Sequence, residues 1–255
     1  MKKPHILLTN DDGISAQGLR QLWKNLSPIA KISIVAPSQE KSGTGLGITC
    51  FQSLKVHEIL WEDAETQAWS VSGTPADCVK MAVNKILNER PDMIVSGINR
   101  GSNAGRNALY SGTVGAAIEG SLQGIPSIAF SCFDPSNPNY EATRDISVKI
   151  VEHFLKEPLK DANPLNVNFP SKIHSQFKGV RLARQGLRFW KEKIQRDEGQ
   201  DSAFWLGAQE QTFSNENAES DSILLEAGFV TVVPLHVNDL THNKSFENLK
   251  KTFKI

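Results

Sequence analysis

Short apolar runs alternate with amphipathic stretches through the first half of the chain, and this alternation restricts the folds that the chain can adopt. Residues 6–9 form one apolar run, and residues 16–26 then carry apolar side chains at helical spacing. The pattern repeats, which predicts further strands at residues 32–35, 93–95 and 127–130 and further helices at 76–87 and 112–122. Strands and helices that alternate in this way predict an α/β fold with a mainly parallel sheet and helices on both of its faces.

The second half of the chain is less regular. We expect a helix at residues 140–155, a strand at 165–169 and a last strand at 229–235. The intervening polar stretch carries glycines and isolated aromatic side chains (Trp190 and Trp205), which suits hairpins or an extended arm better than a second core. The predicted organisation is a core at residues 1–170, an arm at 171–222, and a final strand with the C-terminal tail at 223–255.

Charge and composition argue against several classes of partner. The 28 Lys and Arg residues balance the 28 Asp and Glu residues, so a dedicated binder of nucleic acid polymers is not expected. No apolar run approaches the roughly 20 residues of a membrane-spanning helix, and the first run is too short for a signal peptide. The three cysteines form no CxxC pair, so we expect neither a disulfide framework nor a zinc site. The same cysteine content leads us to expect a cytoplasmic location.

Asp11 and Asp12 directly follow the first predicted strand, at the edge where parallel sheets bind ligands. Two adjacent carboxylates offer the oxygen ligands that hard cations prefer, and Gly13 allows a turn that would direct both at one ion. The alternative interpretation is an Asp-Gly turn that caps the following helix.

Three further polar loops are expected at the same edge of the sheet. Residues 41–45 offer the Ser42 hydroxyl and free backbone N–H groups, and residues 96–105 offer Asn99 among glycines that let the backbone approach a ligand. Residues 110–113 open a helix, where two hydroxyls stand beside unpaired N–H groups that suit an anion. Each loop alone is explained by an ordinary turn or cap. Together they indicate a hard cation beside a phosphate.

The histidines and the spacing of the acidic residues narrow the chemistry. Six histidines are scattered without an HxH or HExxH pattern, so oxygen ligands favour Mg²⁺ or Mn²⁺ over Zn²⁺. The DxDxT pattern of aspartyl-phosphate phosphatases, the Walker loop and the GxGxxG fingerprint are absent from the sequence. These absences argue against three common phosphate and nucleotide chemistries.

Several longer motifs run through the chain: LLTNDDG at residues 7–13, GTPADCV at 73–79, PDMIVSGINRGSNAG at 91–105 and YSGTVGAAIEG at 110–120. Through them the chain resembles the SurE family, the stationary-phase survival proteins, which are metal-dependent nucleotidases. The resemblance extends to residues 166–170, 205–207, 220–221 and 228–235 and so covers nearly the whole length. Residues 38–41, 44–47 and 106–109 depart from the usual pattern, which concerns the substrate range and not the reaction class.

The resemblance implies a Rossmann-like core with an extended β-rich C-terminal arm that exchanges between subunits of a homodimer or homotetramer. It implies a phosphomonoesterase that hydrolyses nucleoside 5′- and 3′-monophosphates to nucleoside and phosphate, with exopolyphosphatase activity on short polyphosphate as an addition. Carried over position by position, the ligands of one divalent cation per subunit (Mg²⁺ or Mn²⁺) would be Asp11, Asp12, Ser42 and Asn99.

On this basis we expect the cation to polarise the phosphoryl group and the two aspartates to be catalytic, with Asp12 favoured over Asp11 as proton acceptor from the attacking water. The residues expected to bind the phosphate or substrate are Asn10, Gly43, Thr44, Asn99, Asn103, Ser111, Gly112 and Thr113. No set of residues indicates how the base or the ribose is recognised.

Other interpretations stay open at this point. A non-catalytic module could bind nucleotide or phosphate with the same loops and without turnover. A structural protein could use the arm as its functional surface, with the polar loops incidental. The arm could also be a self-contained hairpin that does not exchange between subunits.

Overall fold

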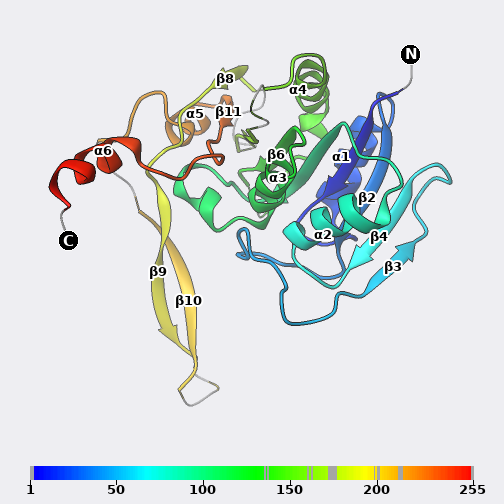
Figure 1. The fold of residues 1–255 in the computed structure, drawn as a ribbon, viewed down its shortest axis with the longest axis horizontal. Helices are drawn as coiled ribbons and strands as arrows, with labels where there is room; N and C mark the ends of the chain where they lie inside the picture. Colours follow the sequence, from blue (N-terminus) through cyan, green and yellow to red (C-terminus); the bar gives the residue numbers. More distant parts are fainter. Residues whose placement is uncertain are drawn as a thin grey trace.

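The computed structural model describes residues 3–134, 136, 138–159, 161, 163–171, 177–197, 199, 202–211 and 215–253. In these parts of the chain a nine-stranded sheet forms the body, and a two-stranded hairpin stands away from it (Figure 1). The sheet has the order β3-β4-β2-β1-β5-β6-β7-β11-β8. Its strands are β1 His5–Thr9, β2 Lys31–Pro37, β3 Val56–Ile59, β4 Gln67–Val71, β5 Met93–Arg100, β6 Ser127–Cys132, β7 Leu165–Phe169, β8 Val180–Leu182 and β11 Val230–Pro234.

Parallel pairing dominates this sheet. The central strand β1 lies between β2 and β5 and is parallel to both, and β5, β6 and β7 continue the parallel run. Among the described strands of this nine-stranded sheet, only the pairs β3–β4 and β7–β11 are antiparallel. The predicted α/β fold with a mainly parallel sheet is therefore confirmed.

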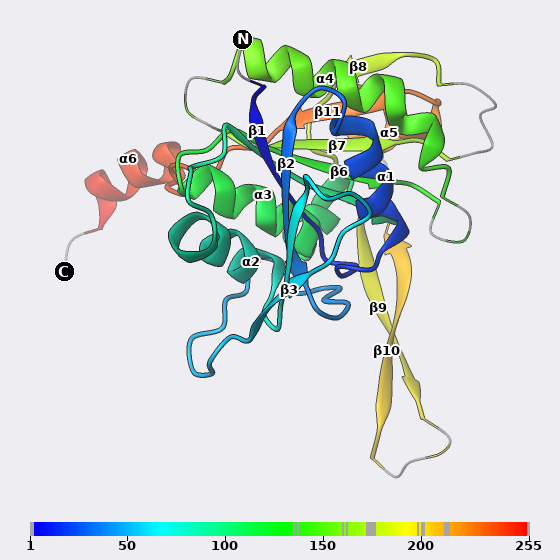
Figure 2. The same cartoon turned by 90° about the vertical axis from the view of Figure 1, so that its right-hand side faces the viewer.

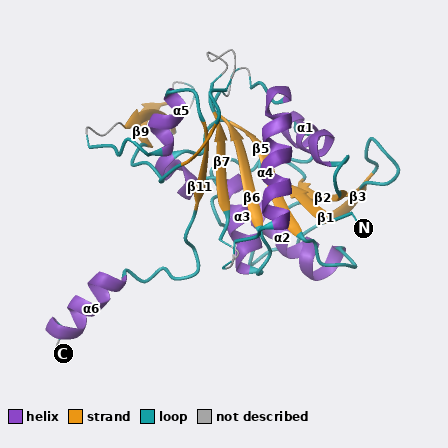
Figure 3. Ribbon diagram, turned by 90° about the horizontal axis from the view of Figure 1, so that it is seen from above, coloured by secondary structure: helices purple, strands orange, loops and turns teal. Residues whose placement is uncertain are grey.

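Alternate residues of β1 explain why helices cover both faces (Figure 3). Ile6 and Leu8 enter one apolar cluster with residues of α1 (Gln17–Leu26) and α4 (Arg144–Lys156). Leu7 enters a second cluster with residues of α2 (Pro75–Met81) and α3 (Gly112–Leu122). A strand with apolar side chains on both faces needs cover on both, as parallel sheets generally do.

Two predicted boundaries differ from the structure. We expected a strand to end at Val95, but β5 continues through Arg100 with a register shift between Ser96 and Asn99 against β6. Gly97, with φ of +129°, supplies the conformation that this irregular stretch requires. The helix expected at 76–87 ends at Met81 and continues as one π-helical turn, Ala82–Ile86.

The antiparallel pair of β3 and β4 was not predicted. β3 (Val56–Ile59) is short, and none of its residues is buried. It therefore lacks the run of apolar side chains by which a strand can be predicted from sequence. Its position at the sheet edge explains this composition, because an edge strand needs little burial.

The C-terminal third holds the hairpin and two short helices. β9 (Phe189–Arg196) and β10 (Phe204–Gln211) form the hairpin, which Figure 2 shows projecting from the body on the side opposite the N-terminus. Within the stretch expected as an arm, β8 pairs with β11 in the main sheet, so only the hairpin stands off. α5 (Asp221–Glu226) precedes β11, and α6 (Asn243–Thr252) lies within the segment expected as the C-terminal tail.

The described helices offer no membrane span: none of them combines the length and apolar character that crossing a bilayer requires.

Replacing Gly18 by Ala should destabilise the protein, because α1 approaches β5 most closely there. A Cβ at Gly18 would lie 2.0 Å from the carbonyl oxygen of Ile98. The clash should outweigh the gain in helix propensity and lower the free energy of unfolding by about 2 kcal/mol. Urea denaturation measures this, with Lys24→Ala on the exposed side of the same helix as control. Equal stability of the two variants would contradict the close packing.

Candidate functional site

The carboxyl ends of β1 and β5, the loop after β2 and the start of α3 meet at one edge of the sheet. Asp11 follows β1 directly, and its backbone oxygen accepts a hydrogen bond from the N–H of Lys41 (2.7 Å), which fixes the loop after β2. The hydroxyl of Thr113, in the first turn of α3, donates to Asp11 Oδ1 at 2.5 Å. Segments that are about 100 residues apart in sequence thus converge on one side chain.

Gly112 makes this convergence possible. A Cβ at this position would lie 2.8 Å from Cβ of Asp11 and 3.0 Å from Oγ1 of Thr44. Any larger residue would therefore push the start of α3 away from the aspartate. Ser111 caps the same helix by accepting a hydrogen bond from the N–H of Val114.

Asp11 is buried, with only 4% of its surface exposed. The pKa of its carboxyl is raised from 3.8 to about 6, mainly by burial. The hydrogen bond from Thr113 lowers this pKa, and the negative charge of Asp12 raises it further. The charged form of Asp11 is therefore costly in the protein without a bound cation.

Asp12 faces a different space. It lines a neighbouring cavity of about 370 Å³ with Glu40, Arg100 and Tyr140. The backbone N–H of Arg100 donates to Asp12 Oδ2 at 3.2 Å. Burial raises the pKa of Asp12 as well, against this hydrogen bond, and the charge of Glu40 raises it further.

Ser42 and Asn99 lie with Asp11 around one cavity of about 460 Å³. The hydroxyl of Ser42 donates to Glu40 Oε1 (2.7 Å), and the amide nitrogen of Asn99 donates to the carbonyl of Gly101 (2.8 Å). Because that bond uses its nitrogen, the side-chain oxygen of Asn99 is the end that can serve a cation.

The residues expected to bind phosphate fall into two groups. Gly43, Asn99, Asn103 and Ser111 line the cavity together with Asp11 and Ser42. The others support the site without lining it: Asn10 donates to the carbonyl of Gly13 (2.9 Å), Thr44 donates to the carbonyl of Lys41 (2.9 Å), and Gly112 and Thr113 contact Asp11.

A buried polar network behind Asn103 was not predicted. The side chain of Asn103 donates to Ser131 Oγ, its backbone N–H donates to Asn168 Oδ1, and its carbonyl accepts from Asn166, each at 2.8 Å. Asn166 and Asn168 stand at alternate positions of β7, so both point to the same face. The Asn-Val-Asn alternation in an otherwise apolar strand is the sequence signal that could have revealed the network.

The hairpin also lines the site, which the sequence did not indicate. In addition to the residues named above, the 460 Å³ cavity is lined by Asn107 and Tyr110. Four hairpin residues also line it: Trp190, Lys191, Leu206 and Gly207.

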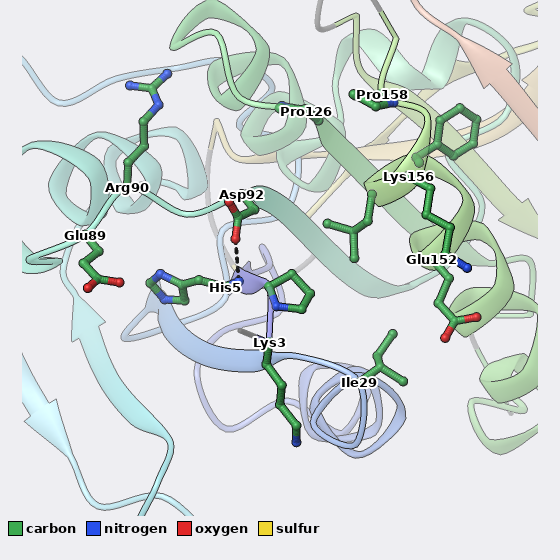
Figure 4. Close-up of a pocket in the computed structure, with 13 residues that line it drawn as sticks. Lys3, His5, Ile29, Glu89, Arg90, Asp92, Pro126, Glu152, Lys156 and Pro158 are labelled. Atoms are coloured by element: carbon green, nitrogen blue, oxygen red, sulfur yellow. Dashed lines mark hydrogen bonds between the residues drawn. The ribbon is translucent and has the colours of Figure 1, made fainter. Parts of the chain in front are cut away.

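A larger cavity of about 680 Å³ opens at the opposite edge of the sheet (Figure 4). It lies where β1 and β5 begin, and there the carboxylate of Asp92 accepts a hydrogen bond from the N–H of His5 (2.7 Å). Its charged lining is mixed, with Lys3, Glu89, Arg90 and Glu152 among the residues labelled in the figure. Because parallel sheets bind ligands at the carboxyl ends of their strands, the smaller cavity is the better candidate.

No group of three or more His, Cys, Asp or Glu side chains gathers around a possible metal position in the described residues. The predicted ligand set contains only two carboxylates, completed by a hydroxyl and an amide oxygen, so it does not depend on such a group.

The comparisons with known proteins show the family to which the chain belongs. The family model described as "Survival protein SurE" matches residues 6–192. The chain belongs to the SurE family. A SurE-family relative called 5′-nucleotidase SurE, from Protochlamydia amoebophila, is 47% identical over 255 residues, covering 99% of this chain and 97% of the relative. One of the same name from Flavobacterium psychrophilum is 40% identical, covering 95% of each chain.

A solved SurE structure supports the fold. The crystal structure of SurE from Aquifex aeolicus superposes with a TM-score of 0.82 at 35% identity, covering 98% of this chain and 100% of the other. The predicted membership of the SurE family and the predicted Rossmann-like architecture are both confirmed.

Asp11→Asn should stabilise the chelator-treated protein at neutral pH. The raised pKa means that the folded state binds more protons than the unfolded state between pH 3.8 and about 6, so stability falls as the pH rises through this window. The amide avoids this loss and still accepts from Thr113, so the gain should be near zero at pH 3.8 and at most about 3 kcal/mol at pH 7.5. Urea denaturation across pH measures it, with the exposed Asp145→Asn as control. A lower midpoint for Asp11→Asn at pH 7.5 would contradict it.

Proposed function

We propose that this SurE-family protein is a metal-dependent 5′-nucleotidase that hydrolyses nucleoside 5′-monophosphates to nucleoside and phosphate. The observation that carries the proposal is one cavity lined by a buried carboxylate (Asp11), a hydroxyl (Ser42), an amide (Asn99) and the cap residue of a helix N-terminus (Ser111). Cation ligands and anion donors in the same cavity suit a phosphate monoester with its counter-ion. The names of the two relatives, 5′-nucleotidase SurE, support the same reaction.

The proposed metal ligands are Asp11, Asp12, Ser42 and Asn99, with one Mg²⁺ or Mn²⁺ per subunit. Their chemistry fits such an ion, because within the described residues neither aspartate forms an ion pair with a lysine or arginine. Two neighbouring carboxylates whose pKa values are raised by burial are best ionised beside a divalent cation. Asp12 would contribute from the adjoining cavity. When bound, the ion would polarise the phosphoryl group and offset its charge.

The protein's own groups then orient the phosphate and move the proton. The Asn103 side chain, the Ser111 hydroxyl and backbone N–H groups at Gly43 and the start of α3 would bind phosphoryl oxygens as charge develops on them. Asp12 would accept a proton from the water that attacks phosphorus, with Asp11 as the other candidate. The phosphorus–oxygen bond to the ribose breaks, and the nucleoside leaves with a proton from solvent.

Several finer points belong to this proposal. Nucleoside 3′-monophosphates and short polyphosphate are further proposed substrates, since the cation and anion sites address the phosphate group that all of them share. We also propose a cytoplasmic location, which suits the three free cysteines Cys50, Cys78 and Cys132.

Phosphate release from AMP should require added Mg²⁺ or Mn²⁺ and stop with EDTA. Asp11→Asn and Asn99→Ala should each lower kcat by about 100-fold or more, because each removes a proposed ligand of the cation. The charge of that cation stabilises the transition state. Asp145→Asn, on the exposed face of α4, is the matched control. Full activity of the double variant Asp11→Asn/Asp12→Asn would refute the metal site, and nucleotide binding without turnover would favour a non-catalytic module.

We propose that the hairpin holds a homodimer or homotetramer together. Ile194 and Phe204 lie on one face of the hairpin and are 66% and 61% exposed in a single chain, which argues for a partner surface. Light scattering should give a mass of at least twice 28.1 kDa. Replacing both residues by Ser should shift the mass towards the monomer, whereas a monomeric unmodified protein would rule the assembly out.

A further inference from the structure

The candidate cavity has two chemically distinct sides. The side formed by the sheet edge carries Asp11, Ser42, Asn99 and Ser111, all polar. The side formed by the hairpin carries the indole of Trp190 and the apolar side chain of Leu206, together with Gly207 and one cationic side chain, Lys191. A nucleoside monophosphate has the same division, with a charged phosphate at one end and a flat aromatic base at the other.

Trp190 borders more than this cavity. It also lines an adjoining cavity of about 380 Å³, where Phe133, Leu225 and Ala104 supply apolar surface. Asn99, Arg100 and Ser102 line both spaces as Trp190 does, so the two cavities adjoin. In the single chain about half of its surface is exposed (49%), so much of this large ring is free of contacts within the chain itself.

The strand that carries Trp190 is anchored beside the site. The backbone N–H of Trp190 donates to Asn107 Oδ1 (2.8 Å), and the N–H of Arg106 donates to the carbonyl of Arg188 (2.8 Å). Gly105, with φ of +61°, lies so close that a Cβ would stand 2.4 Å from the Arg188 carbonyl oxygen. These contacts fix the base of the hairpin against the segment that follows β5.

A buried carboxylate secures the same junction. Asp221 is fully buried and accepts hydrogen bonds from the N–H groups of Gly105, Gly186 and Ser222, at 2.9, 2.9 and 2.8 Å. It therefore joins the segment after β5, the approach to β9 and the start of α5. The backbone that carries Trp190 is consequently anchored next to the segment that follows β5, at the candidate site.

We propose that Trp190 stacks on the base of the nucleoside monophosphate and thereby positions its phosphate over the polar side of the cavity. The inference rests on the proposed function and adds the group that recognises the leaving nucleoside. Every nucleobase has an aromatic face, so a single indole platform binds purines and pyrimidines without hydrogen-bond selection. The consequence is a broad base preference, with purines favoured by their larger stacking area.

Trp190→Ala should lower kcat/KM for AMP roughly tenfold, mainly through KM, because base–aromatic stacking contributes on this scale. Ribose 5-phosphate carries the same phosphate ester without a base, so its kcat/KM should stay within about twofold of the unmodified protein. The ratio of the two values is the readout that a general disturbance of the cavity would not change. Equal losses for both substrates, or no loss for AMP, would overturn the stacking role.

Two further variants sharpen the test. Trp190→Phe keeps an aromatic face and should recover most of the AMP activity, whereas Trp190→Leu keeps only apolar bulk and should resemble Ala. Trp205→Ala is the matched control: this tryptophan belongs to the same hairpin, is 65% exposed, pairs with Gln195 and so points to the opposite face from Trp190. A selective loss for AMP in Trp205→Ala, equal to that of Trp190→Ala, would contradict the assignment.

A binding measurement separates this inference from the proposed reaction. Adenosine should quench the tryptophan fluorescence of the metal-loaded protein, and Trp190→Phe should abolish that part of the quenching. If the unmodified protein releases no phosphate from AMP, the proposed function fails. If it does release phosphate while Trp190→Phe and the unmodified protein are quenched alike, only the stacking inference fails.

Discussion

The carboxylate of Asp11 has little contact with water and no ion-pair partner among the described residues, yet two separate segments are placed by contacts with this residue. Lys41 and Thr113 donate to this residue, and Gly112 contacts its side chain. The loop after β2 and the start of α3 are thereby held at the end of β1. Such an arrangement is costly for the folded protein on its own, and the proposed cation would offset this cost, which is a common relation between stability and function at active sites.

Much of this architecture could be predicted from local signals. Apolar runs such as residues 6–9 end sharply at turn residues, and the helices between them show a clear 3.6-residue period. The predicted end of the strand at Val95 was wrong, because glycine and asparagine usually mark loops, whereas β5 continues through Arg100. The edge strand β3 was not predicted, because none of its residues is buried and its apolar and polar side chains do not alternate clearly.

The site divides in the same way. Asp11, Ser42, Asn99 and Ser111 were predicted because each follows a strand or opens a helix, and the ends of parallel strands share one edge. The place of Trp190 in the cavity could not be predicted, because it depends on contacts between residues about 80 positions apart, such as Trp190 with Asn107. Nor could the sequence tell that Asp12 lines a separate cavity from its neighbour.

The hydrogen bonds to Asp221 have a consequence for how this protein can change over evolution. Because one side chain ties the root of the hairpin to the backbone next to the candidate site, a change in the angle of the hairpin would displace one wall of the candidate cavity. With the proposed assembly through the hairpin, quaternary structure and substrate preference would be inherited together, and a lineage that alters one would have to readjust the other.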